Sequence, residues 1–151
     1  MYGIMNKILG IIVAFVLVIF MLANVMVADQ LQARRSIVAE VTNFIDEITD
    51  SAAMDDQHIA DLYLACNAYG PICDVQVLRY TRVVNPVPGS SPPRSRVSYV
   101  PVDKTDTWNQ GDICQVTVKE VGMTGLSYFL YNSLGLHMAP VDFTLAGRVR
   151  K

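Results

Sequence analysis

The sequence predicts an α+β fold, in which a long N-terminal helix packs against a small antiparallel sheet with a crossover helix. Three observations lead to this prediction. Residues 8–28 are an uncharged apolar run of helical length, an amphipathic pattern continues to residue 50, and short alternating segments follow between turn-forming residues. The 151 residues suffice for one anchor and one compact domain. We therefore expect three parts, at residues 1–28, 29–50 and 51–151.

The apolar run has the length of a membrane span. Its 21 residues contain one strongly polar side chain, Asn24. As a helix the run would be about 31 Å long, which matches the hydrocarbon core of a bilayer. The run is longer than the core of a signal peptide, and its best cleavage site has Met26 where a small residue is required. We expect the segment to be retained and to cross the membrane.

The helix should continue past the membrane. No Pro or Gly interrupts residues 11–50, so one helix is expected from about residue 6 to residue 50. Its first half is apolar all round, whereas its second half has apolar side chains at a spacing of three and four. That stripe consists of Leu31, Ile37, Val38, Val41, Phe44, Ile45 and Ile48. The change of pattern at Asp29 marks a change of environment.

The remaining elements follow from turn and strand signals. Asp55 or Asp56 can cap a short helix at residues 57–67, which Gly70-Pro71 ends. Alternation predicts four strands, at residues 72–84, 97–102, 113–121 and 141–149. An exposed loop rich in Pro, Gly and Ser is expected at residues 85–96, and the crossover helix at residues 124–136. The first three strands should form an antiparallel meander, to which the last strand returns.

Three cysteines allow at most one intramolecular disulfide. Cys66 and Cys73 have six residues and a Gly-Pro turn between them, which suits a short bridge. A bridge between Cys73 and Cys114 on neighbouring strands is the competing pairing, and three reduced, partly buried thiols are the third alternative.

Nothing in the sequence predicts catalysis. The net charge is −2 and no Lys/Arg tract is present, so we expect no nucleic-acid partner. His58 and His137 lack a second ligand at metal-binding spacing, and no nucleophile motif or Gly-rich phosphate loop occurs. The sequence therefore predicts a protein that is not an enzyme and has no cofactor or metal.

The candidate functional residues lie on the long helix. Those expected in the core of an assembly are Ile8, Ile12, Phe15, Val16, Ile19, Phe20 and Asn24. Asn24 could hydrogen-bond a neighbouring helix or bind water at the interface. Arg34 and Arg35 lie just beyond the anchor, where they would meet lipid headgroups or pair with Asp46 and Glu47 of a staggered neighbouring copy.

The whole chain resembles a pilin-type subunit of the type IV filament superfamily, nearest to the TadE-like minor pilins of tight-adherence (Tad) pili from Gram-positive bacteria. The architecture is similar throughout, and the local resemblance lies in Gln32-Ala33-Arg34-Arg35 and in the Gly-Asp turn and alternating valine strand at residues 110–118. The chain differs from the family at Met5, where pilins usually have a Glu near the start of the apolar helix.

The resemblance implies a structural subunit of an extracellular pilus-like filament or of its assembly platform. Its partners would be further copies of itself, other pilus assembly proteins, and the membrane before assembly. We expect a single-pass protein of the cytoplasmic membrane with its C-terminal domain outside, because Lys7 and the amino terminus favour a cytoplasmic start. Arg34 and Arg35 weigh against that orientation. The alternative function is a monomeric single-span anchor that presents a ligand-binding domain.

Overall fold

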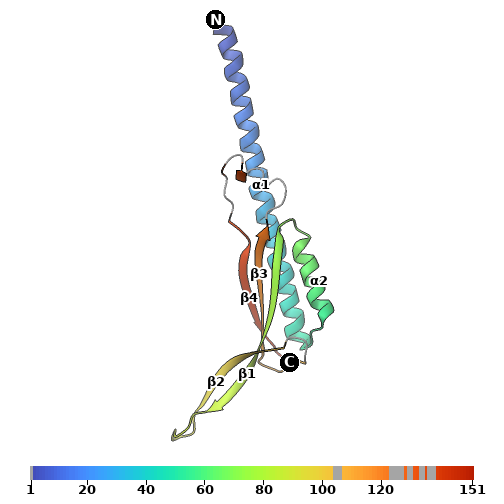
Figure 1. Cartoon of the computed structure of the whole chain (residues 1–151), viewed down its shortest axis with the longest axis vertical. Helices are drawn as coiled ribbons and strands as arrows, with labels where there is room; N and C mark the ends of the chain where they lie inside the picture. Colours follow the sequence, from blue (N-terminus) through green and yellow to red (C-terminus); the bar gives the residue numbers. More distant parts are fainter. Residues whose placement is uncertain (1, 104–106, 123–127, 129–130, 133–134, 136–138) are drawn as a thin grey trace.

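The structure is a computed structural model that describes residues 2–103, 107–122, 128, 131–132, 135 and 139–151. Within these residues, two helices and four strands are long enough to name (Figure 1). They are α1 (Tyr2–Ser51), α2 (Asp56–Asn67), β1 (Ile72–Pro86), β2 (Ser95–Val102), β3 (Ile113–Gly122) and β4 (Asp142–Arg148). The predicted α+β class is confirmed, because α1 packs on a four-stranded antiparallel sheet beside α2.

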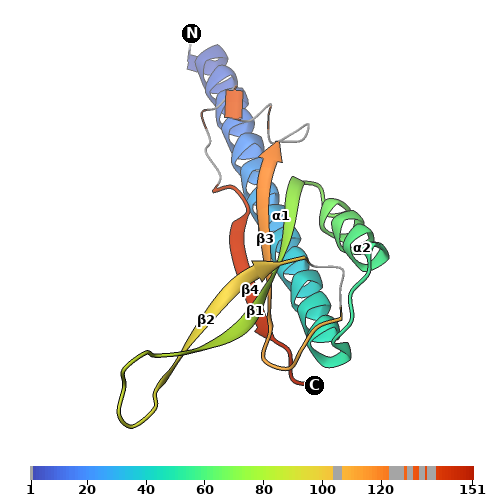
Figure 2. The same ribbon diagram turned by 60° about the horizontal axis from the view of Figure 1, so that its bottom comes forward.

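Helix α1 is one uninterrupted element, as its lack of Pro and of internal Gly after residue 10 predicts. Its 50 residues give it a length of about 75 Å. The N-terminal half stands free of the sheet, and the C-terminal half runs alongside the strands (Figures 1 and 2). The buried stripe begins at Met26, one turn before the change of pattern at Asp29.

A short connection turns the chain from α1 into α2. Ala52 has a φ of 56°, and its backbone N–H donates to the Ile48 carbonyl at 2.9 Å. Asp55 caps α2, as one of the two predicted residues, by accepting a hydrogen bond from the His58 backbone N–H at 2.9 Å. These contacts fold α2 back against α1.

The strand order, β2-β1-β3-β4, corrects the predicted meander. A meander would place the second strand between the first and the third, but β3 pairs with β1 instead. The burial of side chains gives the reason: β3 buries Cys114, Val116 and Val118, whereas β2 has no buried residue. The strand with an apolar face therefore lies against the helix, and β2 is left at the edge.

The strand β1 is long enough to pair twice. Its residues 72–80 pair with β3, and its residues 79–86 pair with β2. Beyond Tyr80 the two strands leave the body as a ribbon (Figures 1 and 2). We call residues 81–100 the hairpin arm. The predicted loop at residues 85–96 is shorter than expected, because its first and last two residues belong to the strands of this arm.

The core lies between the C-terminal half of α1, α2 and one face of β1, β3 and β4. In the described part of the chain, sixteen buried apolar side chains form it. They are Ile37, Val41, Phe44, Ile45, Ile48, Met54, Leu62, Cys66, Cys73, Val77, Trp108, Cys114, Val116, Val118, Val141 and Val149. The predicted crossover helix at residues 124–136 falls largely outside the described residues.

Candidate functional site: the apolar half of α1

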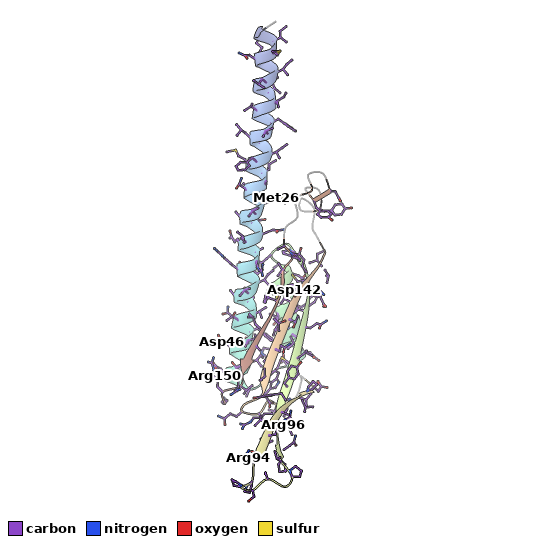
Figure 3. The ribbon with its side chains drawn as sticks, turned by 90° about the vertical axis from the view of Figure 1, so that its left-hand side faces the viewer. Met26, Asp46, Arg94, Arg96, Asp142 and Arg150 are labelled. Carbon is purple, nitrogen blue, oxygen red and sulfur yellow. The ribbon has the colours of Figure 1, made fainter. Side chains whose placement is uncertain are left out.

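No described residue covers the apolar half of α1. Within the described residues this is the one helix long and apolar enough to cross a membrane, with a mean hydropathy of 3.0 over its best 18-residue window. Of the residues predicted for an assembly core, five are more than half exposed and Ile19 is half-buried. The five are Ile8 (53%), Ile12 (54%), Phe15 (67%), Val16 (58%) and Phe20 (66%). Figure 3 shows side chains projecting to both sides along the N-terminal half of the helix.

The same helix is fixed tightly to the head at its other end. Ile37, Val41 and Ile48 are completely buried against the sheet. At Gly147 of β4 the backbone comes so close to α1 that an added Cβ would overlap the Ile45 side chain. The apolar half therefore points in a direction that the packing of the head determines.

Asn24 satisfies part of its hydrogen bonding within α1. Its side-chain amide donates to the Phe20 carbonyl at 2.8 Å, one turn earlier. Such a bond hides the amide N–H from lipid without a second helix, because it closes on the same helix. The predicted bond to a neighbouring helix could still use the side-chain oxygen.

The four charged residues predicted to pair between copies do not pair with one another within one chain. Arg34 and Arg35 are exposed and form no ion pair with any other described residue. Asp46 lies 3.4 Å from Arg150 (Figure 3). Glu47 lies 3.7 Å from His58. These exposed pairs contribute little to stability. The two acids therefore have weak partners in their own chain with which a neighbour's arginine would compete.

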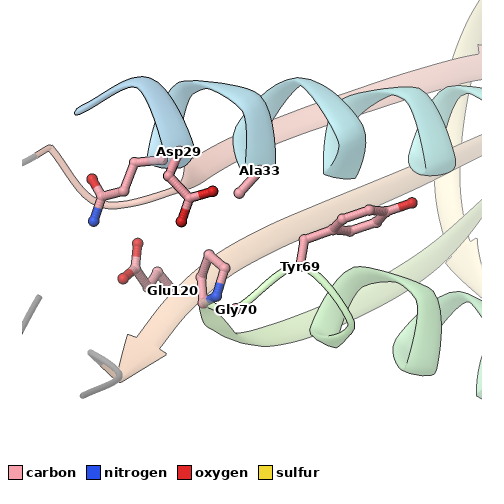
Figure 4. Close-up of a pocket in the computed structure, with 7 residues that line it drawn as sticks. Asp29, Ala33, Tyr69, Gly70 and Glu120 are labelled. Atoms are coloured by element: carbon pink, nitrogen blue, oxygen red, sulfur yellow. The ribbon is translucent and has the colours of Figure 1, made fainter. Parts of the chain in front are cut away.

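A small notch of about 60 Å³ lies where α1 leaves the apolar run. Asp29 of α1 and Glu120 of β3 line it from opposite sides, with Tyr69 beyond them (Figure 4). The Glu120 carboxylate accepts a hydrogen bond from the Val141 backbone N–H at 2.8 Å, and the Tyr69 hydroxyl donates to Glu40 at 2.8 Å. Glu120 thus holds the start of β4 in place.

The three cysteines are free and buried. Cys73 lies opposite Glu120, and Cys114 lies opposite Arg79, so six residues of β1 separate the two cysteines along the sheet. That distance is about 20 Å, well beyond the reach of a disulfide, and the predicted pairing of Cys73 with Cys114 is wrong. Burial, with a smaller effect of nearby Cys73, raises the pKa of Cys66 to about 11. The structure holds these two neighbours as thiols, and their pairing stays a prediction.

One buried site escaped the sequence analysis. Arg79, 5% exposed, donates to Asp112, 1% exposed, from Nε at 3.1 Å and from a terminal nitrogen at 2.9 Å. The guanidinium also lies 5.3 Å from the ring centre of Trp108 and donates to the Thr107 carbonyl at 3.0 Å. Arg79 has the same strand parity as the inward-facing Val77, and that parity was the signal available in the sequence.

The remaining polar residues do not gather into a further site. Among the described residues, no three His, Cys, Asp or Glu side chains lie close enough to hold a metal ion. His58, in the described part, contacts Asp55 and Glu47, whereas His137 lies outside it. Comparisons of the chain with protein-family models, with curated proteins and with solved structures find no significant match.

Proposed function

We propose that this protein is a structural, non-enzymatic subunit that α1 holds in the membrane and that polymerises through α1 into an extracellular pilus-like filament. The observation that carries the proposal is the bare apolar half of α1, rigidly continuous with a helix packed into the head. The resemblance to type IV pilins supports the same function.

The apolar half needs a cover at every stage. Leaving a large apolar side chain in water instead of burying it costs about 1.5–3 kcal/mol of free energy. Lipid provides that cover before assembly. In a filament the apolar halves of neighbouring copies would replace lipid, so that the subunit could leave the membrane without exposing the helix.

The continuity of α1 favours assembly over simple tethering. A tether needs only a span and a linker of any direction. Here no Pro or Gly lies between the apolar run and the buried stripe, so every copy holds its head at the same angle to its helix. Identical copies with a fixed angle between helix and head can repeat in a regular array.

The inter-subunit pairing of Arg34 and Arg35 with Asp46 and Glu47 stays part of this proposal. The four residues lie on one helix, and about 18 Å separates the arginines from the acids along its axis. Two parallel copies offset by that distance would bring them together.

Introducing a charge into the apolar half should abolish assembly. We expect cells that produce Val16→Asp or Phe20→Asp to release at least about tenfold less of the protein in sheared fibres, because a buried unpaired carboxylate costs several kcal/mol. The measurement is shearing of the cells, followed by immunoblotting and electron microscopy of the released fibres. The fluorescence of Trp108, the single tryptophan, should show a folded head.

The matched controls are Val16→Leu and Phe20→Leu, which keep the helix apolar and should assemble as the original chain does. Fibres of normal length from either Asp variant would show that these residues do not lie in the core. If shearing leaves all of the original chain in the membrane fraction as a monomer, the result would favour the single-span anchor.

A further inference from the structure

The hairpin arm is bonded to the head near its base, where the Tyr99 hydroxyl accepts a hydrogen bond from Arg148 at 3.3 Å. Farther out, among the described residues, β1 pairs with β2 alone and no strand pairs with the outer edge of β2. Apolar side chains of the arm remain accessible on both strands. Val84 of β1 is 52% exposed, and Val97 and Tyr99 of β2 are 44% and 37% exposed. A two-stranded ribbon is marginally stable by itself in water, and such an edge is a template for contact with another chain.

The arm is also purely basic. Residues 81–100 contain Arg82, Arg94 and Arg96 and no acidic residue. All three arginines are exposed, and none forms an ion pair with another described residue. Figure 3 shows Arg94 and Arg96 at the end of the molecule farthest from the apolar half of α1.

A groove of opposite character lies between α1 and α2. It has a volume of about 340 Å³, and Glu40, Glu47 and Asp61 line it above apolar Phe44 and Leu62. Residues 36–73, which include both walls, contain seven acidic residues and no Lys or Arg. Within the described residues, the groove carboxylates have only a tyrosine, a histidine and a glutamine as partners.

The arm cannot reach the groove of its own molecule. It leaves the head on the side away from α2, and it extends beyond the C-terminal end of α1 (Figures 1 and 2). Six residues of β1 carry it about 20 Å past Tyr80. A second copy, parallel to the first and displaced along α1 by on the order of 30 Å, would present its groove at the height of the arm.

We infer that the hairpin arm of one copy docks in the α1–α2 groove of a second copy, with Arg94 and Arg96 against Glu40 and Asp61. The contact joins two different surfaces of one molecule and is therefore heterologous; when the rotation between copies does not close a ring, such a contact repeats into an open array. The inference rests on the proposed filament function, to which it adds a contact outside the helical core.

Charge reversal tests the contact. We expect Arg94→Glu/Arg96→Glu and Glu40→Lys/Asp61→Lys each to lower the mass of sheared fibres at least about tenfold, because like charges would face each other. Combining all four changes should restore fibre mass to within about threefold of the original, since the charges again complement each other. The matched control for the reversed arm is Lys119→Glu/Lys151→Glu. It makes the same change of net charge as Arg94→Glu/Arg96→Glu on exposed residues elsewhere, and it should assemble normally.

Cysteine crosslinking between copies gives a second readout. Copies with Ser95→Cys in the arm, mixed in detergent with copies carrying Asn43→Cys in the groove, should form a crosslinked dimer that decreases as salt increases. Crosslinking no greater than for either variant alone would overturn the inference. So would reversed arms whose loss of fibres is not rescued by reversed grooves, because the arm would then bind something else. Absence of fibres from the original chain would instead refute the filament proposal, which the crosslinking does not need.

Discussion

The buried ion pair between Arg79 and Asp112 fixes the base of the hairpin arm to the head. Arg79 lies where β1 changes partner, since it and Tyr80 pair with both β2 and β3. Asp112 also accepts a hydrogen bond from the Asn109 backbone N–H at 3.1 Å, and so holds the turn before β3. One carboxylate thus joins the arm, a turn and the sheet.

Removing that carboxylate should weaken the whole head. We expect Asp112→Ala to lower the free energy of unfolding by about 3–5 kcal/mol, because it leaves a buried guanidinium without a counter-charge. Urea unfolding of the full chain in detergent, followed by Trp108 fluorescence, measures the change. The exposed Asp142→Ala is the control and should alter it by less than about 0.5 kcal/mol. Equal effects of the two substitutions would contradict the structural role of the pair.

The cap of α2 should make stability depend on pH. Hydrogen bonds from the backbone and side chain of His58 lower the pKa of Asp55. A carboxyl group with a lower pKa in the folded state stabilises the fold above its unfolded pKa, and the benefit is lost as the pH falls through the folded pKa. Asp55→Asn keeps a capping oxygen without the charge. The difference in Tm between the original chain and this variant should therefore shrink between about pH 5 and pH 3. A constant difference would show that the charge plays no part.

At this scale the sequence was informative where local rules apply. Asp55 was identified as a candidate cap because an Asp directly before a helical pattern of apolar residues is itself the signal for an N-cap. Arg79 was not identified as buried, because a charged side chain in an exposed strand position is the more common arrangement. Its burial depends on Asp112, which is 33 residues away in the sequence.

Helix α1 and strand β4 are in close contact at Gly147. A Cβ on Gly147 would overlap the Ile45 side chain and lie 3.0 Å from Thr49 Cγ2. Ile45 and Thr49 are both buried and cannot move outward. The absence of a side chain at Gly147 therefore lets the helix lie directly on the strand.

We expect Gly147→Ala to lower the free energy of unfolding by about 1–3 kcal/mol, as overpacking of a core does. The same urea experiment measures it. Gly122→Ala is the matched control, because its Cβ would meet exposed Ile72 at an ordinary 3.4 Å. A Gly147→Ala chain as stable as the control would mean that α1 and β4 can separate at little cost.

The elements were predicted better than their arrangement. Periodicity located α1, α2 and the four strands to within a few residues, because each is marked by its own side chains. The order of the strands was wrong, since neighbours along the chain were assumed to pair. With 15 residues, β1 is long enough to pair with β3 in its first part and with β2 in its second. The alternation of apolar and polar residues within a strand does not indicate which strands pair with it.

For the whole molecule, the described parts make a rod with a head on one half and an arm beyond it (Figure 1). The proposed functions assign each part a contact: the bare half of α1 to the core of a filament, the arm to the groove of another copy. The sequence predicted the first surface from composition alone. It could not predict the groove, because α1 and α2 form it together.

The unbroken α1 also links rotation to position. Each residue of a helix turns the chain by about 100° and advances it about 1.5 Å. Inserting one residue near Asp29 would therefore rotate the head, with its arm and groove, by about a quarter-turn around the apolar half. Inserting four residues would bring the head back close to its original orientation. The number of residues between the apolar run and the head thus determines which side of the head faces a neighbouring copy.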